Sequence, residues 1–338
     1  MSEGEASRGE QASRVVVFDE FGGPEVLRIA DAPVTEPGPG EVRVRIEAFA
    51  VNPLDVMMRS GTSPAPVPLP HSRLGIEATG VIDKVGPRTG GIRPGDPVIL
   101  AAIPDPSKNG SYADHTTVRA NTVVPRPSGL DIAEAAAIWV GFSTAYGALI
   151  EAAGMRPGDT VLISGASGSV GRAAIQLANH LGAVPLAITR NADRIEELEA
   201  AGAASVIVSS RGDLAADVLR ETNGAGADIV LDLVRGPGQR DLLRATRPHG
   251  KLVAAGFLDA RPTPEPLQST VDVVGYRGFD YLLDPDVLAR MNAFMQAAVR
   301  LGSLRPELDA TLDLDHVADA QRRFESGVRA GKKVVVTT

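Results

Sequence analysis

The 338-residue chain contains no cysteine. Disulfides, thiolate nucleophiles and every zinc site that uses Cys ligands are therefore excluded. No HxH or HxxxH spacing occurs among its five histidines, which are His71, His115, His180, His249 and His316. The sequence therefore predicts that the protein holds no metal.

The chain also lacks an excess of basic residues and a long apolar run. Its 34 Lys and Arg against 42 Asp and Glu give a formal net charge of −8, which disfavours nucleic acid as a partner. No stretch approaches the roughly 20 apolar residues of a membrane-spanning helix. We expect residues 1–13 to form a disordered tail, neither signal peptide nor anchor, because no apolar segment follows its charges. These features together favour a cytoplasmic protein that does not bind a membrane.

Short strands broken by Gly and Pro occupy the N-terminal third of the chain. They are expected at 14–19, 26–31, 41–51, 75–86 and 95–102. Around residues 131–153 the apolar period becomes helical, and Asp131 is a plausible N-cap. The pattern predicts a β-rich domain that ends near this helix.

From Thr160 strands and helices alternate. Strands are expected at 160–165, 184–190, 205–210, 227–234 and 250–257, and helices at 170–183, 191–203, 213–224 and 236–246. This alternation predicts a parallel sheet covered on both faces, and hence an α/β fold. We expect the last elements, helices at 286–302 and 312–327 and a strand at 332–338, to return to the first domain.

The first strand of this alternating region runs directly into the sequence GASGSVG. Ala166, Gly168 and Gly171 match a GxGxxG-like pattern whose first glycine has become alanine. Such a loop brings backbone N–H groups close to a pyrophosphate, and the following helix N-terminus attracts its charge. The alternative is a merely tight strand-to-helix turn, but strand, loop, helix and second strand follow in the required order. We expect dinucleotide binding at the loop residues Ala166, Ser167, Gly168, Ser169 and Val170.

The end of the second strand of the alternating region bears on the choice of cofactor. NAD-binding proteins usually place Asp or Glu about 20 residues after the glycines. Here Arg190 occupies that place, with Thr189 before it and Arg194 one helical turn on. A cation suits the 2′-phosphate of NADPH. The alternative is a solvated arginine beyond the strand end.

A single carboxylate, Glu77, lies in the apolar stretch LGIEATGVIDKVG at 74–86. Desolvating an unpaired carboxylate is expensive, so Glu77 requires a partner. The sequence leaves open whether that partner is a metal, a substrate, or an Arg or Lys.

Several segments together carry a family resemblance, in the right order over nearly the whole chain after Arg14. They are FDEFGGPEVLRI, EPGPGEVRVRIEAFAVNPLDVMMRSG, LGIEATGVIDKVG, GSYADHTTV, GFSTAYGAL, RPGDTVLISGASGSVGRAAIQLA and GKKVVV. The chain resembles the medium-chain dehydrogenase/reductase superfamily, and more narrowly its zinc-free quinone oxidoreductase and enoyl reductase branch. The resemblance implies a GroES-like β-rich catalytic domain at 14–136 and 285–338, a doubly wound Rossmann domain at 137–284, and a cleft where they meet.

The resemblance also implies an activity: NADPH delivers hydride to a quinone or an enone, and the protein is a homodimer. It places Asn52 and Asp55 of the NPxD stretch at the nicotinamide pocket, Thr144 beside the nicotinamide, and Gly256 and Phe257 along it. The alternatives are a loop-fixing Asn, a structural Asp, a helix Thr and a core Phe.

Two positions depart from the pattern of the family. Ile76 stands where zinc-dependent relatives have His, so we expect Glu77 to pair with an Arg or Lys. Met57 stands where many members have a Tyr that is assigned to proton donation or substrate contact; Tyr112, His71 and Tyr281 are possible substitutes. Two alternatives stay open: an enoyl reductase specialised for a large biosynthetic intermediate, which Met57, Met58 and Trp139 would suit, and a non-catalytic NADPH-binding redox sensor.

Overall fold

The computed structural model describes residues 12–259, 261–264, 270–327 and 333–338. Residues 1–11 of the expected tail lie outside this part, whereas Ala12 and Ser13, also assigned to the tail, begin strand β1 (Ala12–Phe18), where Ser13 is buried. The chain forms two compact units, each held together by its own internal contacts. The first unit comprises the chain up to Arg126, Ala310–Ser326 and Val334–Thr338, and the second comprises Pro127–Asp309 and Gly327–Lys333.

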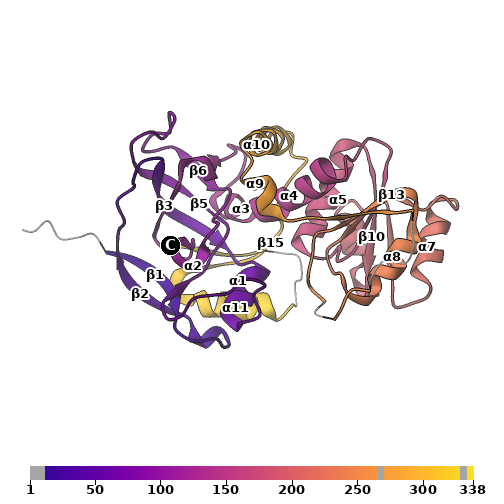
Figure 1. The fold of residues 1–338 in the computed structure, drawn as a ribbon, viewed down its shortest axis with the longest axis horizontal. Coiled ribbons are helices and arrows are strands. Elements are labelled where there is room, and N and C mark those ends of the chain that lie inside the picture. Colours follow the sequence, from indigo (N-terminus) through magenta and orange to yellow (C-terminus); the bar gives the residue numbers. More distant parts are fainter. Residues whose placement is uncertain (1–11, 260, 265–269, 328–332) are drawn as a thin grey trace, which may run out of the picture. The chain divides into compact units, whose positions relative to one another are not determined.

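The first unit is built from two β-sheets (Figure 1). A three-stranded antiparallel sheet has the order β2-β1-β4, with β2 at Arg28–Pro33 and β4 at Ser72–Arg73. A seven-stranded sheet has the order β15-β16-β3-β5-β6-β8, and β7 pairs with β3. Its strands are β3 (Glu41–Ala50), β5 (Ala78–Val85), β6 (Pro97–Leu100), β7 (His115–Arg119), β8 (Val123–Pro125), β15 (Leu308–Asp313) and β16 (Lys333–Thr337).

One hydrophobic core joins the early and late segments of the first unit. Val16, Phe49 and Leu100 contribute to it from early strands, and Val317 and Val336 from the C-terminal end. Alternating apolar residues in β1 and β3 supply it, as the period of two in a strand requires. The other elements of this unit are helices α1 (Pro53–Ser60), α2 (Pro106–Asn109) and α11 (Val317–Glu325), and 3-10 turns at Pro24–Val26, Ala120–Thr122 and Leu314–His316.

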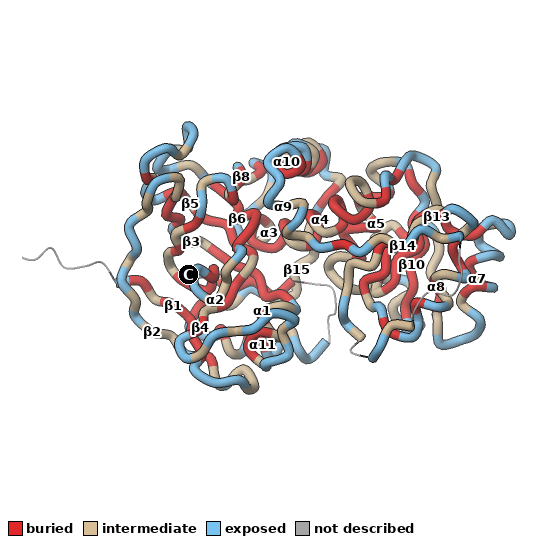
Figure 2. Tube along the Cα trace, viewed as in Figure 1, coloured by how far each residue is buried: buried red, intermediate tan, exposed pale blue. Residues whose placement is uncertain are grey.

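The second unit contains a six-stranded parallel sheet of order β11-β10-β9-β12-β13-β14. The strands are β9 (Thr160–Ile163), β10 (Val184–Thr189), β11 (Ser205–Val208), β12 (Ala227–Asp232), β13 (Thr246–Ala254) and β14 (Asp272–Gly275). In chain order this is 3-2-1-4-5-6, the Rossmann arrangement, in which ligands bind where the strand order reverses. The predicted α/β fold with a doubly wound parallel sheet is therefore confirmed. Buried residues run along β9, β10 and β12, and those of β10 are marked in Figure 2.

The helices of the second unit include one segment with a π-helical hydrogen-bond pattern, Gly147–Ala152 (η3), directly after α4. The α-helices are α3 (Ile132–Ala137), α4 (Trp139–Tyr146), α5 (Ser169–Leu181), α6 (Ile195–Ala200), α7 (Leu214–Glu221), α8 (Gln239–Ala245), α9 (Gly278–Leu282) and α10 (Pro285–Arg300), with 3-10 turns at Ala192–Arg194 and Gly236–Gly238. None of the helices in the described part of the chain has the length and apolar character needed to cross a bilayer.

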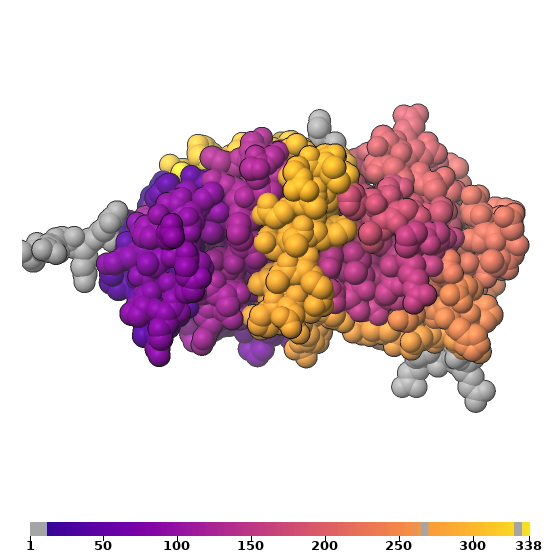
Figure 3. Space-filling view, turned by 90° about the horizontal axis from the view of Figure 1, so that it is seen from above, coloured from indigo at the N-terminus to yellow at the C-terminus, as the bar shows by residue number. Residues whose placement is uncertain are grey.

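Helix α10 groups with the second unit, although we expected residues from 285 onward to join the first. Met291 and Met295 bury one face of the helix. Phe294 packs against Tyr146 and His180, each with 5.2 Å between ring centroids. The opposite face of α10 lies on the molecular surface (Figure 3). These contacts lie within the second unit, so the chain returns to the first only from Ala310.

Candidate active and cofactor-binding sites

A buried polar cluster lies at the N-terminus of α1 in the first unit. Asn52 is the N-cap residue, and its backbone N–H donates to Asp55 Oδ2 at 2.8 Å. Asp55 also accepts from Gly75 N–H at 3.2 Å and from the Tyr112 hydroxyl at 3.2 Å. Asn52, Asp55 and Tyr112 are all at most 1% exposed. The Asp55 carboxylate therefore joins α1, the segment before β5 and the segment before β7.

Glu77 belongs to the same cluster. It is fully buried and immediately precedes β5, rather than lying inside the expected strand 75–86. Its Oε2 accepts from Asn52 Nδ2 at 3.1 Å, and its backbone carbonyl accepts from the Ser111 hydroxyl at 3.2 Å. The side-chain amide of Asn52 is thus one partner of this carboxylate. The expected pairing with an Arg or Lys stays a prediction.

Tyr112 lies inside the first unit rather than on its surface. Its ring stacks on Phe49 with centroids 4.1 Å apart. Burial, followed by the charge of Asp55, raises the pKa of Tyr112 well above its usual value. The phenol therefore stays protonated and is bonded to Asp55, an arrangement that favours a positioning role over direct proton donation.

The other residues considered as substitutes for Met57 have different surroundings. His71 has a side chain that is 70% exposed and lies 2.9 Å from Asp19 Oδ1. Tyr281 stacks on Tyr276 in the second unit, with centroids 5.0 Å apart. Met57 itself is half-buried.

In the second unit, a tight loop connects β9 to α5. Gly165 has φ +61°, in the left-handed region that favours glycine. A Cβ on Gly171 would lie 2.5 Å from Ala166 Cα, so only glycine allows this close approach of helix and loop. The left-handed turn of the GxGxxG-like loop thus falls on Gly165. This is one residue before the fully buried Ala166, which the sequence pattern gives as the first position of the motif. The GASG sequence contains this signal, since Gly165 lies two residues after the end of β9.

The helix that follows begins without a side-chain cap. Gly168 is the N-cap of the 13-residue α5, and no side chain bonds to the first N–H groups. Ser167, Gly168, Ser169 and Val170 are all half-buried. Unsatisfied N–H groups at a helix N-terminus, together with the helix dipole, form an anion-binding site. The residues present therefore fit the pyrophosphate of a dinucleotide.

Two buried charged residues that the sequence did not single out hold this region in place. Arg172 Nε donates to Ser167 O at 3.3 Å, and its guanidinium pairs with Glu307 at 2.7 Å and with Glu197. Arg172 is 3% exposed. An arginine inside the apolar run GRAAIQLA was the available signal, because a buried cation requires such partners.

The second of these residues is Asp232, at the end of β12. It is fully buried, and its Oδ1 accepts from the Ser164 hydroxyl at 2.8 Å and from the N–H groups of Val234 and Arg235 at 3.1 and 2.9 Å. Gln239 Nε2 donates to its Oδ2 at 3.0 Å. Asp232 therefore fixes the loop after β12 beside the end of β9.

The end of β10 presents the residues expected to choose the cofactor. Thr189 is buried, and its hydroxyl bonds to the backbone two residues on. Arg190 is exposed, whereas Arg194 donates to Glu197 Oε2 at 2.8 Å. The Arg261 guanidinium, with a smaller contribution from Arg190, lowers the pKa of Asp259 to about 2. Arg190 is thus the more available of the two cations.

The remaining expected residues lie on α4 and in the segment after β13. Thr144 is half-buried on α4, just before the π-helical segment, a feature often found at functional sites. A Cβ on Gly256 would lie 1.7 Å from Leu233 O, so this position admits only glycine. Phe257 is 48% exposed and is therefore not a core residue. Trp139 is 1% exposed within the second unit.

Within the described ranges no group of three or more His, Asp and Glu residues is arranged to hold a metal ion.

Comparisons with known proteins agree with this architecture. The family "Alcohol dehydrogenase GroES-like domain" matches residues 38–128, and "Zinc-binding dehydrogenase" matches residues 169–296. The quinone oxidoreductase of Homo sapiens is 28% identical over 333 residues, 97% of this chain and 98% of that protein.

Two solved structures are similar over nearly their whole length. An NAD-dependent alcohol dehydrogenase is 32% identical with a TM-score of 0.82, covering 96% of this chain and 99% of the other. A mycobacterial protein solved in complex with NADPH is 27% identical with a TM-score of 0.84, covering 96% and 100%. The GroES-like and Rossmann folds are thereby confirmed.

Proposed function

Because the chain belongs to the quinone oxidoreductase branch of the medium-chain dehydrogenase/reductase superfamily, we propose that this oxidoreductase is an NADPH-dependent reductase of quinones or enones that works without zinc. The observation that carries the proposal is the glycine turn at Gly165, which leads into the uncapped N-terminus of α5 where the strand order reverses. A nicotinamide cofactor, when bound, supplies the hydride, and the protein supplies position and charge.

The N–H groups from Ser167 to Val170 would hold the pyrophosphate. They come from the half-buried loop and the uncapped first turn of α5. Arg172 fixes the loop through Ser167 O, and Asp232 fixes the neighbouring loop. Such support keeps donors in place before the ligand arrives, which lowers the entropy cost of binding.

NADPH, rather than NADH, is favoured by the cation at the end of β10. Arg190 is exposed where an acid would hold the ribose hydroxyls of NADH. Arg194 is engaged with Glu197, so we assign the main phosphate contact to Arg190 and a smaller share to Arg194 and Thr189. The similar proteins include both an NADPH complex and an NAD-dependent enzyme, so the preference rests on these residues.

The proposed absence of zinc rests on the ligands that the sequence lacks. The chain has no Cys, and Ile76 stands at the position of the family's ligand histidine. A Lewis-acid alcohol oxidation would need those ligands. Hydride transfer to an acceptor that is already polarised, such as a quinone or an enone, does not.

The proposed nicotinamide contacts are Asn52, Thr144, Gly256 and Phe257. The cluster at α1 holds Asn52 rigidly, with Asp55 as its positioning residue. Met57 cannot donate a proton, and Tyr112 is bonded to Asp55 inside the unit. We therefore expect quinones to be reduced with less penalty than enones, whose enolate carbon must be protonated by another donor, such as water.

The test is a screen of NADPH oxidation by the purified protein over a panel of quinones and enones, with NADH in parallel. Turnover of one of these classes supports the proposal. Binding of NADPH without turnover of any acceptor would instead support a redox sensor. Activity confined to bulky enoyl substrates would support a specialised enoyl reductase, which the half-buried Met57 would suit, whereas Met58 is buried in the core of the first unit.

We also propose a homodimer. Strand β14 is an edge of the six-stranded sheet, and its Val273 is 39% exposed. An open edge presents unpaired backbone groups that a second copy can bind across a two-fold axis. Light scattering at micromolar concentration measures this directly.

A further inference from the structure

A second pocket, of about 140 Å³, lies within the first unit, between the three-stranded sheet and the β3–β7 pair. Its walls come from β1, the end of β2 and the segment after it, β3, β4, the end of α2, and β7. A water molecule needs only about 10–15 Å³ by this kind of measure, so the pocket has room for a small ion with several heavy atoms. None of the residues assigned above to cofactor or nicotinamide binding lines it.

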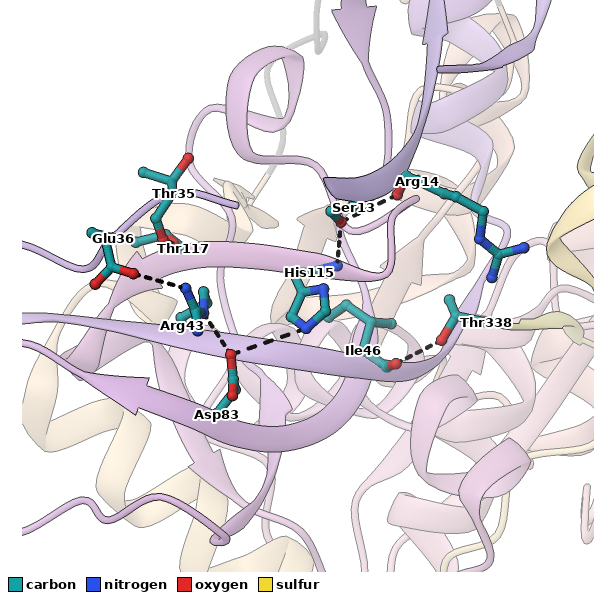
Figure 4. A network of polar contacts seen from close by, with 10 residues as sticks. All are labelled: Ser13, Arg14, Thr35, Glu36, Arg43, Ile46, Asp83, His115, Thr117 and Thr338. Atoms are coloured by element: carbon teal, nitrogen blue, oxygen red, sulfur yellow. Dashed lines mark hydrogen bonds and ion pairs between the residues drawn. The ribbon is translucent and has the colours of Figure 1, made fainter. Parts of the chain in front are cut away.

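Most charged groups around this pocket are already compensated (Figure 4). Arg43 Nε lies 2.5 Å from Asp83 Oδ2, and its Nη1 lies 3.3 Å from Glu36 Oε1. Glu41, the acidic residue among the described residues that line the pocket, accepts from Gly38 N–H at 2.9 Å. Arg43 therefore adds little unbalanced charge, whereas Glu41 forms no ion pair with a Lys or Arg among the described residues.

Arg73 is an arginine on the pocket wall that, unlike Arg43, has no acidic partner among the described residues. Its Nη2 donates to the carbonyls of Gly110 at 2.9 Å and His115 at 3.4 Å, but no Asp or Glu in the described ranges pairs with it. Its Nε is buried and has no hydrogen-bond partner. Burial lowers the pKa of Arg73 to about 10, which leaves it protonated at neutral pH. A half-buried cation with a free N–H and no counter-charge calls for an anion.

Two further polar residues, His115 and Asn109, line the pocket wall. His115 is largely buried, and its Nδ1 has no partner, while its Nε2 lies 4.0 Å from Asp83. Asn109 is exposed at the pocket, and its side-chain amide makes none of the hydrogen bonds found among the described residues. A neutral imidazole offers one N–H, and an amide offers two.

We propose that this pocket binds a small oxoanion, a carboxylate or a phosphate, with Arg73 as its counter-charge and with His115 and Asn109 as hydrogen-bond donors. The site is separate from the glycine loop, which belongs to the other unit. The proposed anion site does not depend on the proposed reductase activity.

The probes are inorganic phosphate and acetate, titrated calorimetrically into the protein at constant ionic strength against chloride, with NADPH in excess to occupy the cofactor site. We expect Arg73→Gln to weaken the tighter-binding anion by about tenfold or more, which corresponds to roughly 1.4 kcal/mol. The matched control is Arg45→Gln, an arginine of β3 whose side chain is 52% exposed and does not line the pocket.

A second variant covers the case in which Arg73→Gln fails to fold. Asn109→Asp changes an exposed side chain and places a negative charge at the pocket, so it should abolish anion binding. Asn121→Asp, at an exposed position outside the pocket, should not. Equal anion binding by wild type, Arg73→Gln and Asn109→Asp would overturn the proposal, as would a wild-type response no larger than that to chloride.

Discussion

In the first unit Asn52, Asp55 and Tyr112 are buried and bonded to one another, whereas in the second unit Arg190 and Phe257 are exposed and the N-terminus of α5 has no cap. The first arrangement satisfies its own polar groups; the second leaves donors free for a ligand. A functional site needs both, since rigid support positions the residues and free groups bind. Substitutions in the buried cluster around Asp55 should therefore change stability, and those at the exposed Arg190 should change affinity.

The largest effect is expected from Asp55→Ala. It removes the acceptor of three buried donors, on Asn52, Gly75 and Tyr112. Each buried donor left unsatisfied costs about 1–3 kcal/mol, so the free energy of unfolding of the first unit should fall by about 3 kcal/mol or more. Urea unfolding measures this, with the exposed Asp31→Ala as the control. A change no larger than that of the control would show that the cluster contributes little to stability.

The next effect concerns cofactor affinity. Arg190→Ala should weaken NADPH binding by about 10- to 100-fold, because a charge-assisted contact contributes roughly 1.5–3 kcal/mol. NADH should change little, since it lacks the phosphate. Arg194→Ala alone should weaken NADPH binding less, because that side chain is paired with Glu197. The double variant should weaken NADPH binding most.

Fluorescence titration of both cofactors measures these affinities, with the exposed Arg220→Ala on α7 as the control. If the double variant retains the full preference for NADPH, or if the wild type binds NADH equally well, the assignment of Arg190 is wrong.

The same contrast explains what the sequence could predict. The strands and helices of the second unit follow from local apolar periods, and Arg190 follows from counting residues after the glycines. The alternating strands and helices were accessible because each element is specified by its own stretch of chain, whereas the Rossmann domain followed from the family resemblance.

What the sequence could not predict depends on residues that are distant along the chain. Asp55 bonds to Tyr112, 57 residues away, and Arg172 to Glu307, 135 residues away. No local pattern encodes such pairs. For the same reason Tyr112 was interpreted as a possible proton donor, and α10 was assigned to the first domain on its position in the sequence alone.

Tyr112→Phe should have a smaller effect than Asp55→Ala. It keeps the stacking on Phe49 and removes one hydrogen bond to Asp55, so the first unit should lose about 0.5–1.5 kcal/mol. With an enone as acceptor, kcat should stay within a few-fold of the wild type, because a positioning residue is not the proton donor. A drop of about 100-fold or more in kcat at unchanged stability would identify Tyr112 as that donor.

The smallest effect is a pH dependence of stability. Burial lowers the pKa of His115, so the unfolded chain takes up a proton first as the pH falls through about 6.5, and stability drops on that side. The contribution of His316 to stability changes with pH in the opposite direction. Asp313 raises the pKa of His316, so this contribution is present below about pH 6.5 and is lost as the pH rises. Urea unfolding between pH 5 and 8 should show a flatter acid-side slope for His115→Gln, whereas His316→Gln should remove the loss of stability above about pH 6.5. An unchanged acid-side slope for His115→Gln would contradict the burial of His115.

Hydride transfer is the central claim, and the most direct measurement follows deuterium from NADPH that is deuterated at the nicotinamide C4 into the product of an enone acceptor. The account predicts that one stereospecific deuterium appears at the β-carbon of the reduced product, while the α-carbon carries hydrogen from water. Reduced product with no deuterium from the nicotinamide C4, for either face of labelling, would contradict direct hydride transfer and with it the proposed reaction.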